Sequence, residues 1–113
     1  LSSHGQWLAA RAIATQLGLA AVSANIRVTE TGELFPVSTE ALRQVVLRKN
    51  RLWRQFWLPT NWAFLYGNRQ AQASSRDHRD ASFRWFPEEV QSIVPRLEQM
   101  DSLIQAKARQ VTD

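Results

Sequence analysis

The chain has 113 residues, 44% of them hydrophobic, and a formal net charge of +4, which suits one small domain with its own core. It contains no cysteine, so disulfides and thiolate metal sites are excluded. No apolar run is long enough to span a membrane, and we expect no membrane partner.

Residues 1–19 are predicted to form a short first helix. Ser3 with Gln6 fits a capping box, Ser2 is the alternative cap, and Gly18 fits the left-handed position that ends a helix. A narrow apolar stripe follows one side of this helix, with Trp7 at its margin. Its members are Ala10, Ile13, Ala14 and Leu17. Small alanines suit a helix that lies on a sheet, so this helix is predicted to cover something that the chain does not contain.

His4 lies beside two serines, which raises the question of a Ser-His catalytic pair. Such pairs depend on geometry and on a third orienting group, and neighbouring residues at a helix start rarely face each other. We therefore expect His4 to face solvent in the first turn.

Residues 20–37 are predicted to form a small β-hairpin. Two short extended pieces, 25–29 and 33–35, flank the turn Glu30-Thr31-Gly32, where glycine permits a positive φ. An isolated two-stranded hairpin is marginally stable in water, so we expect it to lean on the helices.

Residues 38–61 are predicted to form the first of two longer helices, with Ser38 or Thr39 as its cap and Pro59 as its stop. A 3.6-residue period separates an apolar side from a basic side. The apolar side holds Leu42, Val45, Val46, Trp53, Phe56 and Trp57, and the basic side holds Arg43, Arg48, Arg51 and Arg54.

Lys49 interrupts the apolar side of this helix, with Asn50 at its edge. We expect Lys49 to extend along its stem to solvent or to pair with a carboxylate from elsewhere in the chain. An active-site lysine is the alternative, and no neighbouring residue supports it. The residues to which we assign a structural role are Lys49, Asn50, Trp53, Trp57, Trp62 and Trp85.

Residues 60–87 are predicted to form an irregular arm that is aromatic at both ends and polar in the middle. The polar part is interpreted as an internal ion-pair and cap network, or as a loop at the active-site mouth of a larger enzyme or at a partner subunit. A metal site is the weakest interpretation, because adjacent residues cannot all converge on one ion. The candidate binding residues are Arg69, Arg76, Asp77, His78 and Arg79.

Residues 87–110 are predicted to form the second longer helix, beginning at Pro87, with a kink or break near Val94 caused by Pro95. Its apolar residues step by three and four, which indicates a seam that packs on the first longer helix. The seam consists of Val90, Ile93, Leu97, Met100 and Ile104. Formation of a homo-oligomer through this seam is the alternative.

Two stretches resemble SGNH (GDSL-type) serine hydrolases. In that family Asp-x-x-His is followed by Leu or Pro, Thr or Ser, two variable residues, Gly and the last helix of an α/β/α fold. The first stretch that matches is Leu1-Ser2-x-x-Gly5 with Ala9, Ala10, Ile13 and Ala14. The second resembles an extension found after the catalytic domain in a subset of the family. It comprises Leu42-Arg43, Lys49-Asn50-Arg51-Leu52, Trp57-Leu58-Pro59-x-Asn61 and Phe64-Leu65-Tyr66-Gly67-Asn68-Arg69.

Taken alone, these elements predict a mainly α chain with a short first helix, a small β-hairpin, two longer helices and an irregular arm. The resemblance implies that this chain is the C-terminal piece of an α/β/α esterase acting on acyl esters, including carbohydrate-linked ones. Residues 1–19 would be the last helix of the catalytic fold, and residues 20–113 a helical extension that includes the arm 60–87. The catalytic Asp-x-x-His would precede Leu1, so no catalytic residue is assigned here, and no cofactor or metal is implied. The implied partners are the rest of the hydrolase and, through it, the ester substrate; the implied location is secreted or periplasmic.

The alternative function is a basic helical module that binds nucleic acid or another acidic polymer through Arg43, Arg48, Arg51 and Arg54. No helix-turn-helix, zinc-finger or RNA-binding signature accompanies these arginines. Nucleic acid is therefore not the expected partner.

Overall fold

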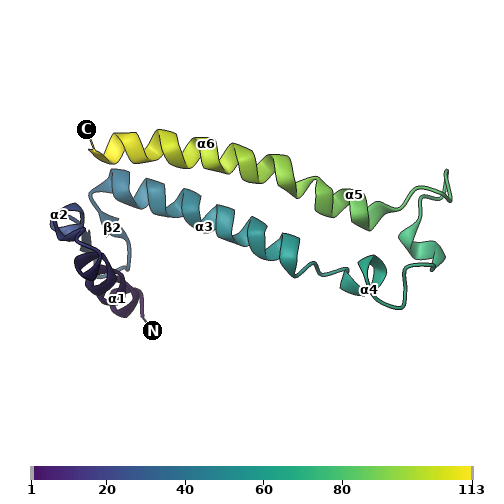
Figure 1. The fold of residues 1–113 in the computed structure, drawn as a ribbon, viewed down its shortest axis with the longest axis horizontal. Helices are drawn as coiled ribbons and strands as arrows, with labels where there is room; N and C mark the ends of the chain where they lie inside the picture. The colour runs from purple at the N-terminus through teal and green to yellow at the C-terminus, as the bar shows by residue number, and fades with distance from the viewer. Residues whose placement is uncertain (1, 113) are drawn as a thin grey trace. The chain divides into compact units, whose positions relative to one another are not determined.

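The computed structural model describes residues 2–112 and is mainly helical, which confirms the mainly α part of the predicted fold class (Figure 1). Within these residues no helix combines the length and the apolarity needed to cross a membrane. The described residues divide into two compact units: a first unit of residues 2–45 with 104–112, and a second unit of residues 46–103. This division does not test the proposed boundary at residue 19, which stays a prediction.

The first unit begins with α1 (Ser3–Gln16). Ser2 is its cap, because the Ser2 hydroxyl accepts a hydrogen bond from the backbone N–H of Gly5 at 3.2 Å. The alternative cap is thus correct, and the Ser3–Gln6 capping box is wrong because Ser3 is already the first helical residue. Gly18 has φ +74° just after the helix, as predicted, and a short helix α2 (Ala20–Ser23) follows.

The predicted hairpin is present as β1 (Arg27–Val28) and β2 (Leu34–Phe35), which pair antiparallel with Val28 opposite Leu34. Gly32 has φ +85°, as the turn requires. A Cβ at Gly32 would lie only 2.8 Å from the Ser3 hydroxyl, so the turn packs tightly against the start of α1. The expectation that the hairpin leans on a helix is confirmed.

The first longer helix, α3, runs from Val37 to Trp57 and ends two residues before Pro59. The carbonyl of Pro36 accepts hydrogen bonds from the N–H groups of Thr39 and Glu40, at 2.9 and 3.3 Å. Ser38 and Thr39 therefore lie inside the helix, and their predicted role as caps is wrong. The residue before the helix is Pro36, whose carbonyl accepts these first hydrogen bonds of the helix.

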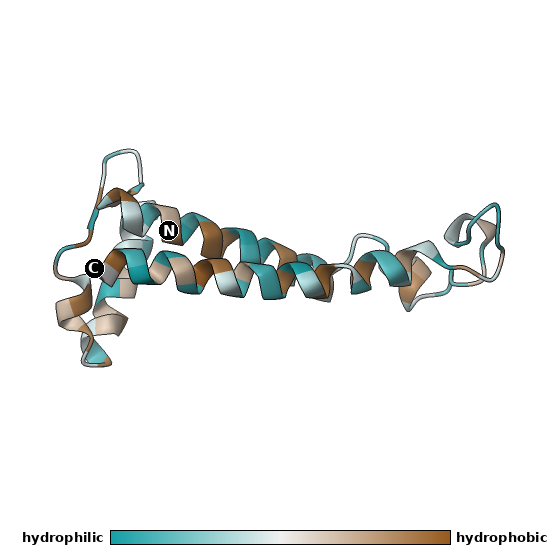
Figure 2. Ribbon diagram, turned by 90° about the horizontal axis from the view of Figure 1, so that it is seen from above, coloured by the Kyte–Doolittle hydropathy of each residue, from teal (hydrophilic) through white to brown (hydrophobic). Residues whose placement is uncertain are grey.

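The core of the second unit lies where α3 meets α6 (Ile93–Thr112), which run side by side in Figure 1. Leu52, Ile93 and Leu97 are buried together, with Phe56 and Met100 partly buried against them. Along both long helices in Figure 2, apolar and polar residues alternate, as in helices with one apolar side. The seam predicted on residues 90–104 is confirmed, because its members are buried or half-buried.

The apolar side of α3 is rotated from the predicted one. Leu52 is buried, whereas Trp57 is 69% exposed and Trp53 is also exposed. The buried residues follow steps of three and four from Val45 through Lys49 and Leu52 to Phe56, and Trp53 and Trp57 lie beside that line. Trp53 and Trp57, predicted on the apolar side, therefore lie outside the buried side of α3.

The second longer helix is divided into α5 (Trp85–Gln91) and α6, with Ser92 between them. The predicted break is confirmed, but it lies two residues before Val94. Pro95 occupies the third position of α6, where a missing N–H removes no helical hydrogen bond. Pro87 likewise occupies the third position of α5, so the predicted start at Pro87 is two residues late.

Candidate functional site

The polar part of the arm is held by hydrogen bonds between its own residues. Asp77, whose side chain is 9% exposed, accepts hydrogen bonds from the backbone N–H of Arg79 at 2.7 Å and from its guanidinium at 3.3 Å. The ring Nδ1 of His78 lies 3.6 Å from the same carboxylate, and the His78 side chain is almost fully exposed. Arg76 pairs with Arg84 in an isolated antiparallel bridge.

Two further groups of side-chain hydrogen bonds lie in the same segment. The carboxylate of Asp80 accepts hydrogen bonds from the hydroxyl of Ser82 at 2.6 Å and from its backbone N–H at 2.8 Å, and these bonds lower the pKa of Asp80. The buried hydroxyl of Ser75, within the 3-10 turn η1 (Ala73–Ser75), lies 2.9 and 2.7 Å from the carbonyls of Gln70 and Gln72. The internal ion-pair and cap network predicted for this segment is therefore present.

Aromatic residues hold the two ends of the arm together. Phe64, in the short helix α4 (Trp62–Leu65), has its ring centroid 5.0 Å from that of Phe86. The indole N–H of Trp85 donates to the carbonyl of Arg76 at 3.1 Å, which supports the structural role assigned to Trp85. Arg69 lies over the Phe64 ring at 5.9 Å rather than in the charged cluster, and Trp62 is exposed.

Lys49 forms an ion pair with Asp101 of α6, so the predicted carboxylate partner exists. The Lys49 side chain is only 21% exposed, because its stem lies on the buried side of α3. Asn50 is exposed.

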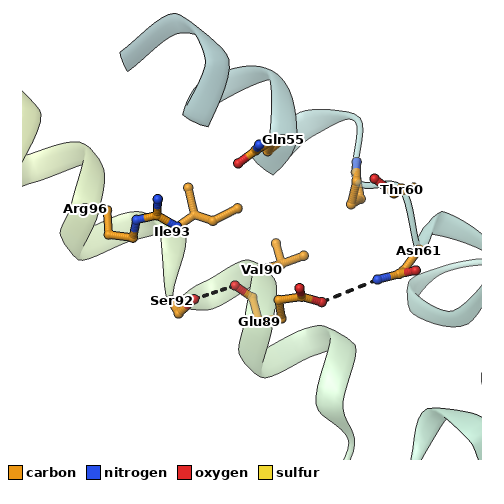
Figure 3. A pocket seen from close by; sticks show the side chains of 9 residues that line it. Gln55, Thr60, Asn61, Glu89, Val90, Ser92, Ile93 and Arg96 are labelled. Carbon is orange, nitrogen blue, oxygen red and sulfur yellow. Dashed lines mark hydrogen bonds between the residues drawn. The ribbon is translucent and has the colours of Figure 1, made fainter. Parts of the chain in front are cut away.

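A hollow of about 230 Å³ lies among the end of α3, the start of the arm, α5 and α6 (Figure 3). Gln55 of α3 and Arg96 of α6 stand on opposite walls, and Asn61 donates to the Glu89 carboxylate at 3.4 Å. The hydroxyl of Ser92 donates to the Glu89 carbonyl at 2.6 Å, so it has no general base. The residues around this hollow suit binding rather than nucleophilic catalysis, and the periodicity of the sequence did not indicate it.

Several apolar side chains remain uncovered in each unit. In the first unit no residue of α1 is buried, and Ile13 and Leu17 are 61% and 69% exposed. His4 is exposed in the first turn, as expected. In the second unit the exposed large side chains include Trp53, Trp57, Leu58, Trp62 and Tyr66.

Among residues 2–112, no group of three or more histidine, aspartate or glutamate side chains is arranged to hold a metal ion. Comparison with protein-family models, curated proteins and solved structures finds no match to this chain. The resemblance to SGNH hydrolases therefore depends on the two motif stretches alone and stays a prediction.

Proposed function

We propose that this chain is the C-terminal portion of an SGNH-type serine esterase, in which it has a structural role and carries no catalytic residue. The observation that carries the proposal is the exposure of Ile13 in α1 and of Leu17 just after it, within residues 1–19, which would be the last helix of that fold. Burial of a Leu or Ile side chain contributes about 1.5–3 kcal/mol, so Ile13 and Leu17 would add substantially to a helix–sheet contact.

The extension motif supports the same proposal. Trp57 and Leu58, which begin its Trp-Leu-Pro-x-Asn element, are both exposed, and they give a second apolar surface that a catalytic domain would cover. The parent enzyme would supply the nucleophilic serine, the oxyanion donors and the Asp-x-x-His pair, which activates the serine. Its substrates would be acyl esters, including carbohydrate-linked ones.

The first test is the reading frame upstream of the Leu1 codon. An Asp-x-x-His ending at the residue before Leu1, with a Gly-Asp-Ser block further upstream, is the expected result. Unrelated upstream sequence would end the proposal.

The second test compares this chain with the longer gene product. We expect the longer product to hydrolyse p-nitrophenyl acetate and to lose that activity to a serine-directed inhibitor, and the 113-residue chain to show no hydrolysis. In the longer product, Ile13→Ser combined with Leu17→Ser should lower the melting temperature, whereas Arg54→Ser, at an exposed position, should not. An inert longer product, or inhibitor-sensitive turnover by the short chain, contradicts the proposal.

A further inference from the structure

One edge of the contact between α3 and α6, within the second unit, forms a hollow of about 230 Å³ that we call the arginine groove. Leu52 and Met100 form its apolar floor. Its polar walls are Arg48, Arg51 and Gln55 from α3 and Arg96 and Gln99 from α6. None of these residues is acidic, so the groove presents only positive charge and neutral polar groups.

The three groove arginines have no ion-pair or hydrogen-bond partner within residues 2–112. Among the described residues, no carboxylate lines the groove, and Glu89, which lines the neighbouring hollow with Arg96, forms no ion pair with it. Asp101 of α6 is bound to Lys49, and Glu98 does not line the groove. Elsewhere in the chain arginines do have partners, as Arg43 does in Glu40 and Arg79 in Asp77.

This arrangement is electrostatically unfavourable as it stands. Arg48 and Arg51 are three residues apart on one helix, so their like charges repel, and Arg96 adds a third charge from the other helix. Leu52 and Met100 give the groove an apolar side, and charges beside an apolar surface interact more strongly than charges in open water. A bound anion would relieve the repulsion. Guanidinium groups present paired N–H donors whose geometry matches phosphate and related oxyanions.

We propose that the arginine groove binds a tetrahedral oxyanion, as a phosphate or sulfate ester whose organic part contacts the floor. In this proposal the guanidinium groups of Arg48, Arg51 and Arg96 donate to the anion, and the amides of Gln55 and Gln99, which also line the groove, provide further donors. Leu52 and Met100 contact the apolar part of the ester. This site is independent of the esterase proposal, because it uses no residue of a catalytic centre.

Arg54 provides a matched control. It lies on the same helix, is exposed and has no partner among the described residues, but it does not line the groove. The test is a calorimetric titration of the full chain with inorganic phosphate, sulfate and phenyl phosphate at low ionic strength. Arg48→Gln and Arg96→Gln should each weaken binding by about tenfold, as expected for loss of a charge-assisted hydrogen-bond pair, and Arg54→Gln by less than about twofold.

Phenyl phosphate should bind more tightly than inorganic phosphate, because only the ester reaches the floor. Equal binding of sulfate and phosphate would identify a general oxyanion site. Preference for inorganic phosphate and phenyl phosphate over sulfate would identify a phosphomonoester site. Either result supports the proposal. Circular dichroism of each variant checks that the exposed substitutions leave the helices intact.

Absence of saturable binding would overturn the proposal, as would an Arg54→Gln variant weakened as much as the groove variants. Binding of a duplex oligonucleotide that falls steeply with salt and depends equally on Arg54 would identify a basic polymer-binding helix instead.

Discussion

At the scale of single residues, Glu40 joins the hairpin to α3. Its carboxylate accepts hydrogen bonds from the backbone N–H of Leu34 at 2.8 Å, from the Arg43 guanidinium at 2.7 and 2.8 Å and from Gln44 at 2.6 Å. The hydrogen bond from Arg43 is the largest cause that lowers the pKa of Glu40 from 4.5 to about 2. The charged form of Glu40 thus stabilises the folded state.

This pKa predicts a pH dependence. A carboxyl with a lowered folded-state pKa stabilises the fold above its unfolded pKa of 4.5, and the stabilisation is lost as the pH falls from 4.5 towards 2. Glu40→Gln should lower the free energy of unfolding by about 1–2 kcal/mol at pH 7 and show a smaller decline below pH 4.5. Urea unfolding at pH 7 and pH 3 measures both. An equal loss of the free energy of unfolding between pH 7 and pH 3 in the variant and the wild type would contradict this role.

The ion pair between Lys49 and Asp101 leads to a second prediction about single residues, on the stability of variants that lack one partner. Removing the carboxylate leaves the ammonium of a mostly buried lysine side chain without its partner, whereas removing the ammonium leaves an aspartate that is half exposed and remains solvated. Asp101→Asn should therefore destabilise the chain by about 1 kcal/mol, and Lys49→Met should be neutral or stabilising. Urea midpoints of the two variants and of the double variant measure the coupling. A more harmful Lys49→Met would contradict the expected asymmetry.

Single residues also show where prediction from the sequence succeeds and fails. A lysine on an apolar stripe needs a partner or a path to water, so the pairing of Lys49 could be predicted. The identity of Asp101 could not, because the two residues are 52 positions apart and only the fold brings them together. The helical period predicts Trp53 and Trp57 on the apolar side of α3, but Leu52 is the buried residue beside them.

At the scale of elements, the contact between α3 and α6 depends on a few leucines. Leu97→Ala removes a buried side chain from the cluster with Leu52 and Ile93, and should lower the free energy of unfolding by about 2–4 kcal/mol. Leu58→Ala removes the same atoms from an exposed position and should change it by less than about 0.5 kcal/mol. Chemical denaturation of both variants checks the difference. Similar losses of unfolding free energy in the two variants would mean that Leu97 does not belong to the core between α3 and α6.

The hairpin turn gives a prediction with an internal control. Gly18 and Gly32 both have positive φ, but a Cβ at Gly18 meets nothing within 4 Å, whereas one at Gly32 meets Ser3. Gly18→Ala should cost about 1 kcal/mol from backbone strain, and Gly32→Ala should cost more because of the added clash. Ser3→Gly should recover part of the Gly32→Ala loss. Thermal melts measure all three; no recovery would contradict the close approach.

The elements themselves were largely predictable because their signals are local. Gly18, Gly32 and the apolar period at 90–104 each act within a few residues of the chain. The caps were harder to predict. Ser38 and Thr39 are residue types that often cap helices, but both lie inside α3, and the first N–H groups of the helix donate to the carbonyl of Pro36. The prolines at 87 and 95 mark first turns rather than first residues, because a proline costs no hydrogen bond at any position of a first turn.

At the scale of the whole molecule, the described residues leave much apolar surface in water. Ile13 on α1, Leu17 just after it, and Trp57 and Trp62 in the second unit are all exposed. The 113-residue chain should therefore bind the dye anilinonaphthalene sulfonate while its circular dichroism remains helical. Trp57→Ser and Ile13→Ser should each reduce the dye fluorescence. No dye binding by the helical chain would contradict this prediction.

The candidate sites were predictable only where they depend on neighbouring residues. The network of Asp77, Arg79 and Asp80 could be predicted as a network, because its partners lie within two or three positions of one another. The arginine groove could not, because Arg96 is distant in the sequence from the α3 arginines. The sequence shows the basic side of a helix, and only the packing of α3 on α6 shows which of those charges share one hollow.

The contact between Trp53 and Trp57 has an optical consequence. The two indoles are one turn apart and stack with their centroids 6.2 Å from each other and a 10° angle between their planes. That geometry exists only while the last turn of α3 remains helical. Fraying of this turn would separate the rings and change the near-ultraviolet dichroism, with little change in the far-ultraviolet signal of the remaining helices. The pair is therefore a built-in spectroscopic reporter for the end of one helix.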